Sequence, residues 1–173
     1  DIGTQLSNYV LPITANGTAE ITKKVLTISG TTASNKIYDG TIDVSETLGT
    51  LDGFVGTETV DSSAVGTFDS KDAGTRTATF VYTLADGTNG GLANNYSLAN
   101  TTDEAEITKA NATVTANSDS KVYNGLSQNV NGFTASGLVN GETISVLTGV
   151  SGSTASGTNA GEYSTSLSGE DGN

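Results

Sequence analysis

Lys36-Ile37-Tyr38-Asp39-Gly40 is the stretch that decides the fold, because it returns 85 positions later as Lys121-Val122-Tyr123-Asn124-Gly125. Four further landmarks return in the same order, with offsets of 84 to 87 residues. They are Asn8-Tyr9 with Asn95-Tyr96, Ile21-Thr22-Lys23 with Ile107-Thr108-Lys109, Val55-Gly56-Thr57-Glu58-Thr59-Val60 with Val139-Asn140-Gly141-Glu142-Thr143-Ile144, and Asp72-Ala73-Gly74 with Asn159-Ala160-Gly161. A period this long indicates small domains in tandem and not a short-period solenoid.

The landmarks divide the 173 residues into three parts. Residues 1–23 are expected to be the C-terminal strands of a preceding repeat, because they carry the two landmarks that close a unit. Residues 24–109, the central unit, are expected to be complete. Residues 110–173, the C-terminal unit, are expected to lack the last strand or strands. We therefore expect a piece of a longer protein.

Alternating apolar and polar residues predict strands in both units. The clearest run is Thr77–Leu84, in which every second residue from Ala78 to Leu84 is apolar and the alternate face carries three threonines. Such a pattern is typical of a half-buried antiparallel sheet. Other residues expected to point inward are Tyr9, Leu11, Leu26, Ile28, Tyr96, Leu98, Ile107, Ala112 and Val114.

Asx-Gly pairs between the runs predict tight turns. With 22 glycines, the chain has no convincing helical stripe, and Val139–Leu147 is expected to form one helical turn at most. The fold class is therefore all-β: small Ig-like β-sandwich domains in an extended array, with β-grasp-like domains as the alternative. Because Thr108–Asn111 leads almost directly from one unit into the next, the array is expected to be a semi-rigid rod.

The composition excludes several functions. The formal net charge is −12, from 19 acidic and 7 basic residues, which argues against nucleic acids and anionic membranes as partners. The sequence contains no Cys and no His, so it offers no Ser-His-Asp or Cys-His arrangement and no usual zinc site. No apolar run approaches about 20 residues, so this fragment is not expected to insert into a membrane. Asp69 and Asp72 are interpreted as residues of a solvated loop, and the chain is not expected to be an enzyme.

The tyrosines that recur in the landmarks are interpreted as structural. Each ring of Tyr9, Tyr38, Tyr96 and Tyr123 is expected to anchor a core while its hydroxyl group bonds to the backbone. The residues after two of them, Asp39-Gly40 and Asn124-Gly125, are expected to form turns.

Two further sets of residues are candidate sites, one for a metal ion and one for glycosylation. The alternative interpretation of both sets is that they are ordinary solvated surface residues. Asp103, Glu104 and Glu106 stand just before the connection to the C-terminal unit, where oxygen ligands would suit calcium, the sole cofactor considered. Asn16, Asn95, Asn100 and Asn111 lie in Asn-x-Ser/Thr sequences and are candidate glycosylation sites. A third hypothesis is an isopeptide bond from Lys36 or Lys121 to a nearby Asn.

The repeated landmarks resemble a known pattern. The Lys-x-Tyr-Asp-Gly opening, the Glu-Thr-Val segment, the Asp-Ala-Gly turn and the Asn-Tyr and Ile-Thr-Lys closing resemble the YDG repeat domain. The C-terminal unit, with Asn124 in place of Asp, resembles the related MBG domain. Both domains occur in tandem in large secreted bacterial adhesins, often of the filamentous-haemagglutinin type exported by two-partner secretion. The resemblance implies an extracellular stalk at the bacterial surface and no catalytic residues.

Two functional hypotheses follow. The first is a stalk segment whose partners are neighbouring repeats of the same chain, which extends a binding tip or supports a biofilm. The alternative is a module that binds a polysaccharide or a host glycoprotein through loops such as residues 85–94, which are expected to be a flexible tip. A missing closing strand also predicts that the C-terminal unit is more mobile or borrows a strand from a neighbour.

Overall fold

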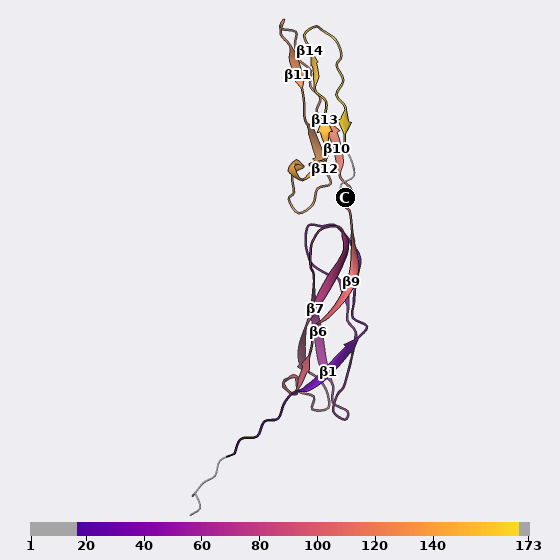
Figure 1. Cartoon of the computed structure of the whole chain (residues 1–173), viewed down its shortest axis with the longest axis vertical. Coiled ribbons are helices and arrows are strands. Elements are labelled where there is room, and N and C mark those ends of the chain that lie inside the picture. Colours follow the sequence, from indigo (N-terminus) through magenta and orange to yellow (C-terminus); the bar gives the residue numbers. More distant parts are fainter. Residues whose placement is uncertain (1–16, 170–173) are drawn as a thin grey trace, which may run out of the picture.

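The computed structural model of the chain describes residues 17–169, and it confirms the all-β prediction. The two units lie end to end along one axis (Figure 1). The strands of the central unit are β1 (Lys24–Ser29), β2 (Thr32–Ala33), β3 (Lys36–Ile37), β4 (Glu46–Thr47), β5 (Thr50–Asp52), β6 (Val60–Phe68), β7 (Gly74–Asp86), β8 (Tyr96–Leu98) and β9 (Thr101–Thr108). Those of the C-terminal unit are β10 (Thr113–Ala116), β11 (Gln128–Val130), β12 (Phe133–Ser136), β13 (Ser151–Gly152), β14 (Ala155–Gly157) and β15 (Leu167–Ser168).

Helical structure in the described residues is limited to two 3-10 turns, η2 (Ala93–Asn95) and η3 (Ile144–Val146). The second lies inside the segment expected to form one helical turn at most. The part of the chain between residues 17 and 169 has no helix with the length and apolar character needed to span a membrane.

A four-stranded sheet in the order β3-β9-β7-β6 forms the larger half of the central unit. The alternation predicted for Thr77–Leu84 is confirmed. Ala78 and Phe80 of β7 are fully buried, whereas Val81, on the opposite face of the strand, is exposed. Ala105 and Ile107 of β9 enter the same core cluster, together with Phe68. Burying each large side chain of such a cluster stabilises the fold by about 1.5–3 kcal/mol.

A second sheet, in the order β5-β1-β8, closes the end of the central unit that lies far from the C-terminal unit. Its core cluster is built on Leu26, Val60 and Tyr96, and the ring of Phe54 meets that of Tyr96 edge-on with centroids 6.1 Å apart. The predicted inward positions Leu26 and Tyr96 are therefore confirmed.

Two strand pairs of the central unit are parallel, which the alternation pattern did not predict. β1 pairs with β8, and β3 pairs with β9, each in parallel register. The antiparallel pairs expected for the Thr77–Leu84 run are present, because β7 lies between β6 and β9 in antiparallel register. Parallel pairs join segments far apart in the sequence, so a local pattern carries no signal for them.

The C-terminal unit is built from three two-stranded sheets, β10-β12, β11-β14 and β13-β15. None of its described residues, 110–169, is buried. Val114 of β10 is half-buried as expected, but Ala112 is exposed, so its prediction as an inward residue is wrong. Because its strands are short and only paired two by two, the described part of this unit has no buried core of the kind found in the central unit.

We expect Gly66→Ala to lower the free energy of unfolding of the central unit by about 1–3 kcal/mol, because it overpacks the core. A Cβ atom at Gly66 would lie 2.8 Å from a ring carbon of Phe80 and 2.9 Å from Cβ of Val44. Urea unfolding followed by circular dichroism measures the change. Gly17→Ala is the matched control, since nothing lies within 4 Å of its added methyl group. Equal stability of the two variants would contradict close packing at Gly66.

Candidate functional site

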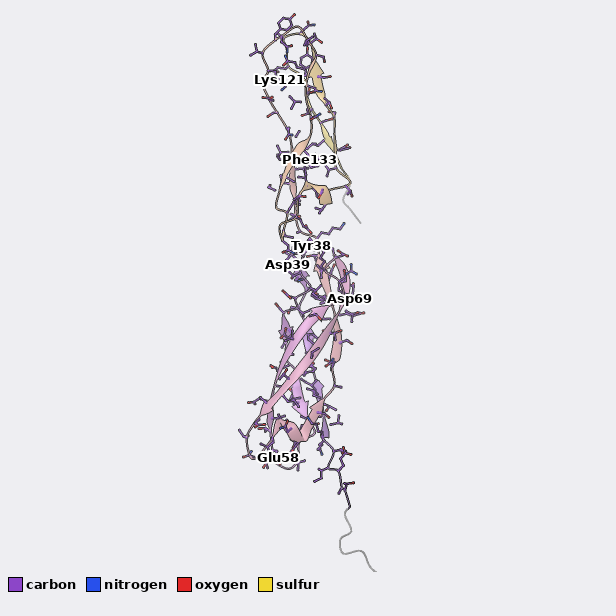
Figure 2. The ribbon with its side chains drawn as sticks, turned by 90° about the vertical axis from the view of Figure 1, so that its left-hand side faces the viewer. Tyr38, Asp39, Glu58, Asp69, Lys121 and Phe133 are labelled. Carbon is purple, nitrogen blue, oxygen red and sulfur yellow. The ribbon has the colours of Figure 1, made fainter. Side chains whose placement is uncertain are left out.

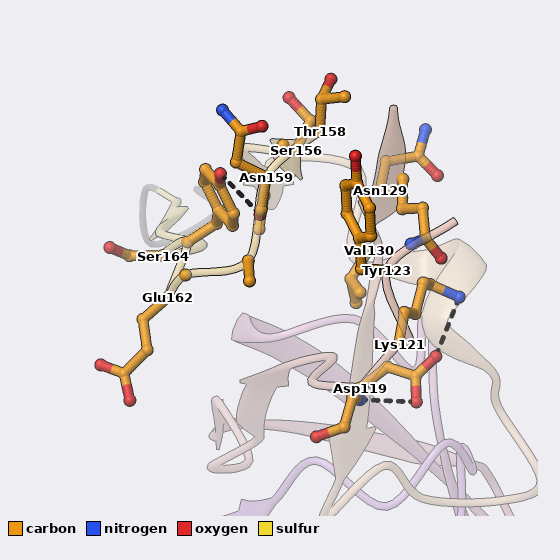
Figure 3. Close-up of a pocket in the computed structure, with 17 residues that line it drawn as sticks. Asp119, Lys121, Tyr123, Asn129, Val130, Ser156, Thr158, Asn159, Glu162 and Ser164 are labelled. Atoms are coloured by element: carbon orange, nitrogen blue, oxygen red, sulfur yellow. Dashed lines mark hydrogen bonds and ion pairs between the residues drawn. The ribbon is translucent and has the colours of Figure 1, made fainter. Parts of the chain in front are cut away.

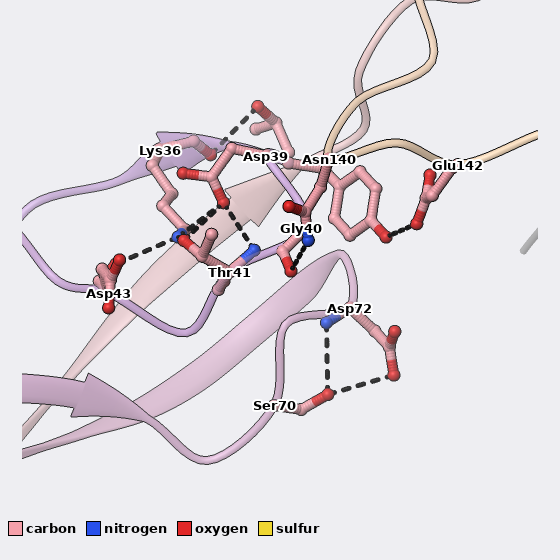
Figure 4. Close-up of polar contacts among 11 residues, drawn as sticks. Lys36, Asp39, Gly40, Thr41, Asp43, Ser70, Asp72, Asn140 and Glu142 are labelled. Carbon is pink, nitrogen blue, oxygen red and sulfur yellow. Dashed lines mark hydrogen bonds and ion pairs between the residues drawn. The ribbon is translucent and has the colours of Figure 1, made fainter.

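The repeated Lys-x-Tyr-Asp-Gly stretch forms a turn that one ammonium group holds together (Figure 4). Lys36 extends from β3, and its Nζ donates to Asp39 Oδ1 at 2.9 Å, to the Thr41 carbonyl at 2.9 Å and to the Asp43 carbonyl at 3.0 Å. The same Nζ lies 5.7 Å from the centre of the Phe68 ring. Since an ammonium group has three hydrogens, these oxygens occupy its donors. The amine hypothesised to form an isopeptide bond is thus engaged by carboxylate and carbonyl oxygens.

Asp39 closes the turn from the other side. Its Oδ1 also accepts from the backbone N–H of Thr41 at 2.9 Å, which is the geometry of an Asx turn. Gly40 between them has a φ of 78°, a left-handed conformation that favours glycine. The hydrogen bond from Lys36, supported by that from Thr41, lowers the pKa of Asp39 from 3.8 to about 2. The expectation that Asp39-Gly40 forms a turn is therefore confirmed.

The tip of this turn contacts the C-terminal unit, and we call the contact the joint. The Tyr38 hydroxyl donates to Oε1 of Glu142, and Lys71 Nζ lies 3.7 Å from the same oxygen. Lys71 Nζ also lies 5.9 Å from the centre of the Tyr38 ring. Asn140 Nδ2 donates to the Gly40 carbonyl at 3.1 Å. Three segments of the chain, far apart in sequence, therefore meet at the joint. Figure 2 shows Tyr38 and Asp39 at the boundary between the two units.

Close backbone approach makes the joint specific for glycine at position 40. A Cβ atom on Gly40 would lie 2.6 Å from Cβ of Asn140, a distance that side chains do not tolerate. Asn140 itself adopts a φ of 51°, one of two non-glycine residues in the described range with a positive φ. Gly40 and Asn140 belong to the Asx-Gly turns Asp39-Gly40 and Asn140-Gly141, and these two turns face each other.

The charges of Glu142 and Lys71 act on the Tyr38 hydroxyl at the joint. The side chain of Glu142 is only 18% exposed, so its charge is partly shielded from water by Tyr38 and Lys71. The hydrogen bond to Glu142 raises the pKa of Tyr38 above its usual value of 10, an effect that Lys71 partly offsets. The phenol is thus held in its protonated, donating form.

An equivalent contact closes the central unit itself. The Tyr96 hydroxyl donates to Oε2 of Glu58 at 2.5 Å and accepts from the backbone N–H of Val55 at 3.1 Å. The hydrogen bond to Glu58 raises the pKa of Tyr96. Glu58 and Glu142 occupy the same place in the repeated Glu-Thr landmark, 84 residues apart. One binds a tyrosine of its own unit, and the other binds a tyrosine of the preceding unit.

The structural role predicted for the tyrosines is confirmed in part. Tyr96 is buried, and Tyr38 packs against the larger core cluster. The partner of the Tyr38 hydroxyl is a carboxylate and not the backbone, which sequence reasoning missed although the Glu-Thr landmark repeats. Tyr123 is 63% exposed, so its prediction as a core anchor is wrong, because it lies in residues 117–127, which form no strand that would hold its ring against a sheet. Tyr9 lies outside the described residues.

The other half of the repeated motif, Asn124-Gly125, also forms its expected turn. Asn124 Oδ1 accepts from the backbone N–H of Leu126 at 2.9 Å, and Gly125 has a φ of 77°. Lys121 does not reach across this turn as Lys36 does, since its Nζ lies 3.0 Å from Asp119.

The three candidate calcium ligands do not converge. β9 alternates, so Asp103 lies on the face of the buried Ala105, whereas Glu104 and Glu106 are exposed on the opposite face. Asp103 Oδ2 accepts from the backbone N–H of Ala33 at 2.9 Å. Among residues 17–169 no group of three or more acidic side chains is placed to hold a metal ion.

The candidate glycosylation sites Asn95, Asn100 and Asn111 are exposed, and Asn16 lies outside the described residues. Asp69 is exposed, and the Asp72 carboxylate accepts from the Ser70 hydroxyl at 3.0 Å in a surface turn (Figure 4). This placement agrees with the interpretation of both aspartates as loop residues.

The loop at residues 85–94 differs from the expected flexible tip, because several hydrogen bonds hold it to the β6 end of the unit. Asn89 Nδ2 donates to the Thr57 carbonyl at 2.9 Å, and the hydroxyl groups of Thr59 and Thr88 lie 2.7 Å apart. Within the loop, the backbone N–H of Ala93 donates to Asp86 Oδ1 at 2.8 Å. The sequence analysis predicted a flexible loop here and did not predict the hydrogen bonds that hold it.

Comparison with known proteins identifies two domains in the chain. Residues 22–104 match the family model of the YDG domain, and residues 112–173 match that of the MBG domain of the YGX type. No curated protein and no solved structure matches the chain significantly.

We expect Tyr38→Phe to loosen the joint, because it removes the hydroxyl that binds Glu142 while leaving the ring in place. Nitrogen-15 relaxation should show the C-terminal unit tumbling more independently of the central unit. Tyr82→Phe is the matched control, since it removes a hydroxyl 2.6 Å from Thr101 Oγ1 inside the central unit. Unchanged relative tumbling in Tyr38→Phe would show that this hydrogen bond does not hold the joint.

The hydrogen bond between Tyr38 and Glu142 predicts that the stability of the joint depends on pH at the alkaline end. Because the pKa of Tyr38 is raised in the folded state, its contribution is fully present below pH 10 and is lost as the pH rises through the folded pKa. An absorbance titration at the tyrosinate band should lose a late component in Tyr38→Phe. Equal titration curves, after scaling for the number of tyrosines, would contradict this.

The lowered pKa of Asp39 predicts that the stability of the chain depends on pH at the acid end. Its folded pKa is about 2, below the ordinary 3.8, so its contribution to stability is present above pH 4 and is lost as the pH falls towards 2. We expect Asp39→Asn to lower the melting temperature at pH 7 and to narrow the difference from the wild type at pH 2. Asp61→Asn, an exposed carboxylate of β6, is the control. A constant difference between pH 7 and pH 2 would refute the role of the charged form.

Proposed function

Because the chain carries a YDG domain followed by an MBG domain of the YGX type, we propose that it is a structural stalk segment of a secreted bacterial surface adhesin. The segment acts outside the cell, where it extends a binding tip from the surface or supports aggregation in a biofilm. Export by two-partner secretion, as for filamentous-haemagglutinin-like proteins, is part of this proposal. The chain acts by length and stiffness and catalyses no reaction.

The joint is the observation that carries the proposal. β9 ends at Thr108 and β10 begins at Thr113, so a short peptide joins the two units. Alone, such a connection limits but does not fix the angle between them. The side-chain contacts of Tyr38 and Asn140 across the boundary supply the additional constraint. A module that bound its ligand alone would have no need of this coupling.

The distribution of charge supports an extended array. The central unit holds 12 acidic and 5 basic residues, and the C-terminal unit holds 5 and 1, so both units are net negative. Like charges on successive units oppose folding of the chain back on itself and favour solubility. Across the boundary, Lys71 of the central unit pairs with Glu142 of the C-terminal unit, so opposite charges and not like charges meet at this contact.

Small-angle X-ray scattering of the full chain tests the stiffness on which the proposal depends. We expect the maximum dimension of a straight two-unit rod, unchanged when the salt concentration is raised, because direct contacts and not repulsion alone hold the units in line. A variant with a Gly/Ser linker inserted between Lys109 and Ala110 is the control and should become shorter on average. Identical scattering from the two proteins would contradict a stiff segment.

Location is tested separately. Antibodies against the chain should label intact cells of the source organism, and external protease should remove the signal. Labelling only after the cells are broken would contradict the surface role without bearing on stiffness.

A further inference from the structure

The joint places a chemically labile pair of residues at the contact between the two units. Within residues 17–169, Asn is followed by Gly at Asn89, Asn124, Asn131 and Asn140. Asn is a thermolabile residue, and a following Gly has no Cβ atom to shield its backbone nitrogen from the Asn side chain. Of these four side chains, that of Asn140 bonds to the other unit. Chemical change at this position therefore acts on the joint.

The reaction open to such a pair is deamidation. The backbone nitrogen of Gly141 loses its proton and attacks Cγ of Asn140, so that a C–N bond forms and a succinimide ring closes. The bond from Cγ to Nδ2 breaks, and Nδ2 leaves as ammonia. Water then opens the ring and leaves an aspartate or an isoaspartate at position 140. The net change consumes one water, releases one ammonia and needs no oxidant or reductant.

The attacking nitrogen is accessible. The backbone N–H of Gly141 donates no hydrogen bond within residues 17–169, whereas that of the next residue, Glu142, donates to the Val139 carbonyl at 3.0 Å. Apart from the chain neighbours of Gly141, no heavy atom lies within 4 Å of the place where its Cβ atom would be. Neither a hydrogen bond nor a packed neighbour therefore withholds this nitrogen from reaction.

The side chain of Asn140, in contrast, is held against Gly40. A Cβ atom on Gly40 would lie 2.6 Å from Cβ, 3.0 Å from Nδ2 and 3.2 Å from Cγ of Asn140. Nδ2 also donates to the Gly40 carbonyl at 3.1 Å (Figure 4). Departure of Nδ2 breaks this hydrogen bond, and packing on Gly40 opposes the rotation that brings Cγ to its own backbone. The closed joint therefore protects the amide.

We propose that Asn140 is a deamidation site controlled by the joint: the amide is protected while the two units are in contact and reacts when the contact opens. The rate of reaction then follows the fraction of time for which the joint is open, as amide exchange follows local opening. This inference goes beyond the stalk function, because it requires neither surface location nor export. It depends on the joint alone.

The product does not restore the contact. An amide offers donors, whereas a carboxylate offers acceptors alone, and the group opposite is the Gly40 carbonyl, which is also an acceptor. The new charge stands two residues from Glu142 and faces the turn that contains Asp39. Lys36 and Lys71 already bond to these two carboxylates. A joint that has opened for long enough to react therefore stays open, and the stiffness of the chain decreases irreversibly.

Asn89 is the internal control for protection by an ordinary hydrogen bond. Its φ of 53° is close to the 51° of Asn140, and it also precedes a glycine. Its Nδ2 donates to the Thr57 carbonyl at 2.9 Å, within the central unit. Opening of the joint leaves that contact in place, so the reactivity of Asn89 is independent of the joint.

Asn124 is the internal reference for a side chain that is held less firmly. Within the described residues its Nδ2 makes no hydrogen bond, and its Oδ1 accepts from the backbone N–H of Leu126 at 2.9 Å. Lys121 of the same turn bonds to Asp119 and not to the turn (Figure 3). We therefore expect Asn124 to react faster than Asn140 in the closed chain.

Peptide mapping by mass spectrometry, during incubation of the full chain at mildly alkaline pH, tests the control by the joint. Tyr38→Phe should raise the rate at Asn140 about two- to tenfold, the factor expected from loss of one hydrogen bond, and should leave the rate at Asn89 unchanged. A Gly/Ser insertion between Lys109 and Ala110 opens the joint without altering its residues and should have the same effect. Tyr82→Phe is the matched control and should change neither rate.

Two results would overturn the proposal. One is a rate at Asn140 that neither Tyr38→Phe nor the insertion raises. The other is a rate at Asn140 that equals the rate at Asn124 in the unaltered chain, since the joint would then give no protection.

The consequence of deamidation is tested with a variant that carries its product. Asn140→Asp should let the two units tumble more independently in nitrogen-15 relaxation, because it puts a carboxylate against the Gly40 carbonyl. Asn89→Asp is the matched control, since it adds the same charge in the central unit and should leave the relative tumbling unchanged. Tumbling of Asn140→Asp that stays coupled as in the unaltered chain would overturn the irreversible opening.

Discussion

The placement of β9 between β3 and β7 is the constraint on which the rest of the structure depends. This strand carries Ala105 and Ile107 into the larger core cluster, and its last residue, Thr108, accepts a backbone hydrogen bond from Tyr38. The same few residues therefore close the core, fix the Lys-x-Tyr-Asp-Gly turn and lead into the next unit. With so few large apolar side chains in the unit, loss of one strand removes a large share of what is buried.

The two units differ in how much they bury. The C-terminal unit has the turns, the short paired strands and the repeated motif of its neighbour, yet none of its described residues is buried. Its firm contact is at the other end, where Glu142 and Asn140 meet the Tyr38 turn. The repeated glutamate serves two purposes: Glu58 accepts from a tyrosine of its own unit, and Glu142 accepts from a tyrosine of the preceding unit.

Sequence patterns predicted the parts of the structure that depend on neighbouring residues. The period of two in Thr77–Leu84 identified the buried face of β7, and the Asx-Gly pairs identified turns such as Asp39-Gly40. Contacts between distant residues had no such signal, which is why the parallel pair β3-β9 was not predicted. The joint was missed for the same reason. The repeated Glu-Thr landmark identifies no partner for Glu142, and only the facing turns bring it to Tyr38.

Hydrogen–deuterium exchange of the full chain at low concentration measures the importance of the β9 position in both units at once. Amides of residues 105–107 should exchange slowly, with the stability of the whole central unit, because the strand is paired on both sides. Amides of residues 161–165 should exchange rapidly, since this segment is in no strand and makes no backbone hydrogen bond within the described residues. Equal protection of the two segments in the monomer would contradict the view that this strand closes a unit.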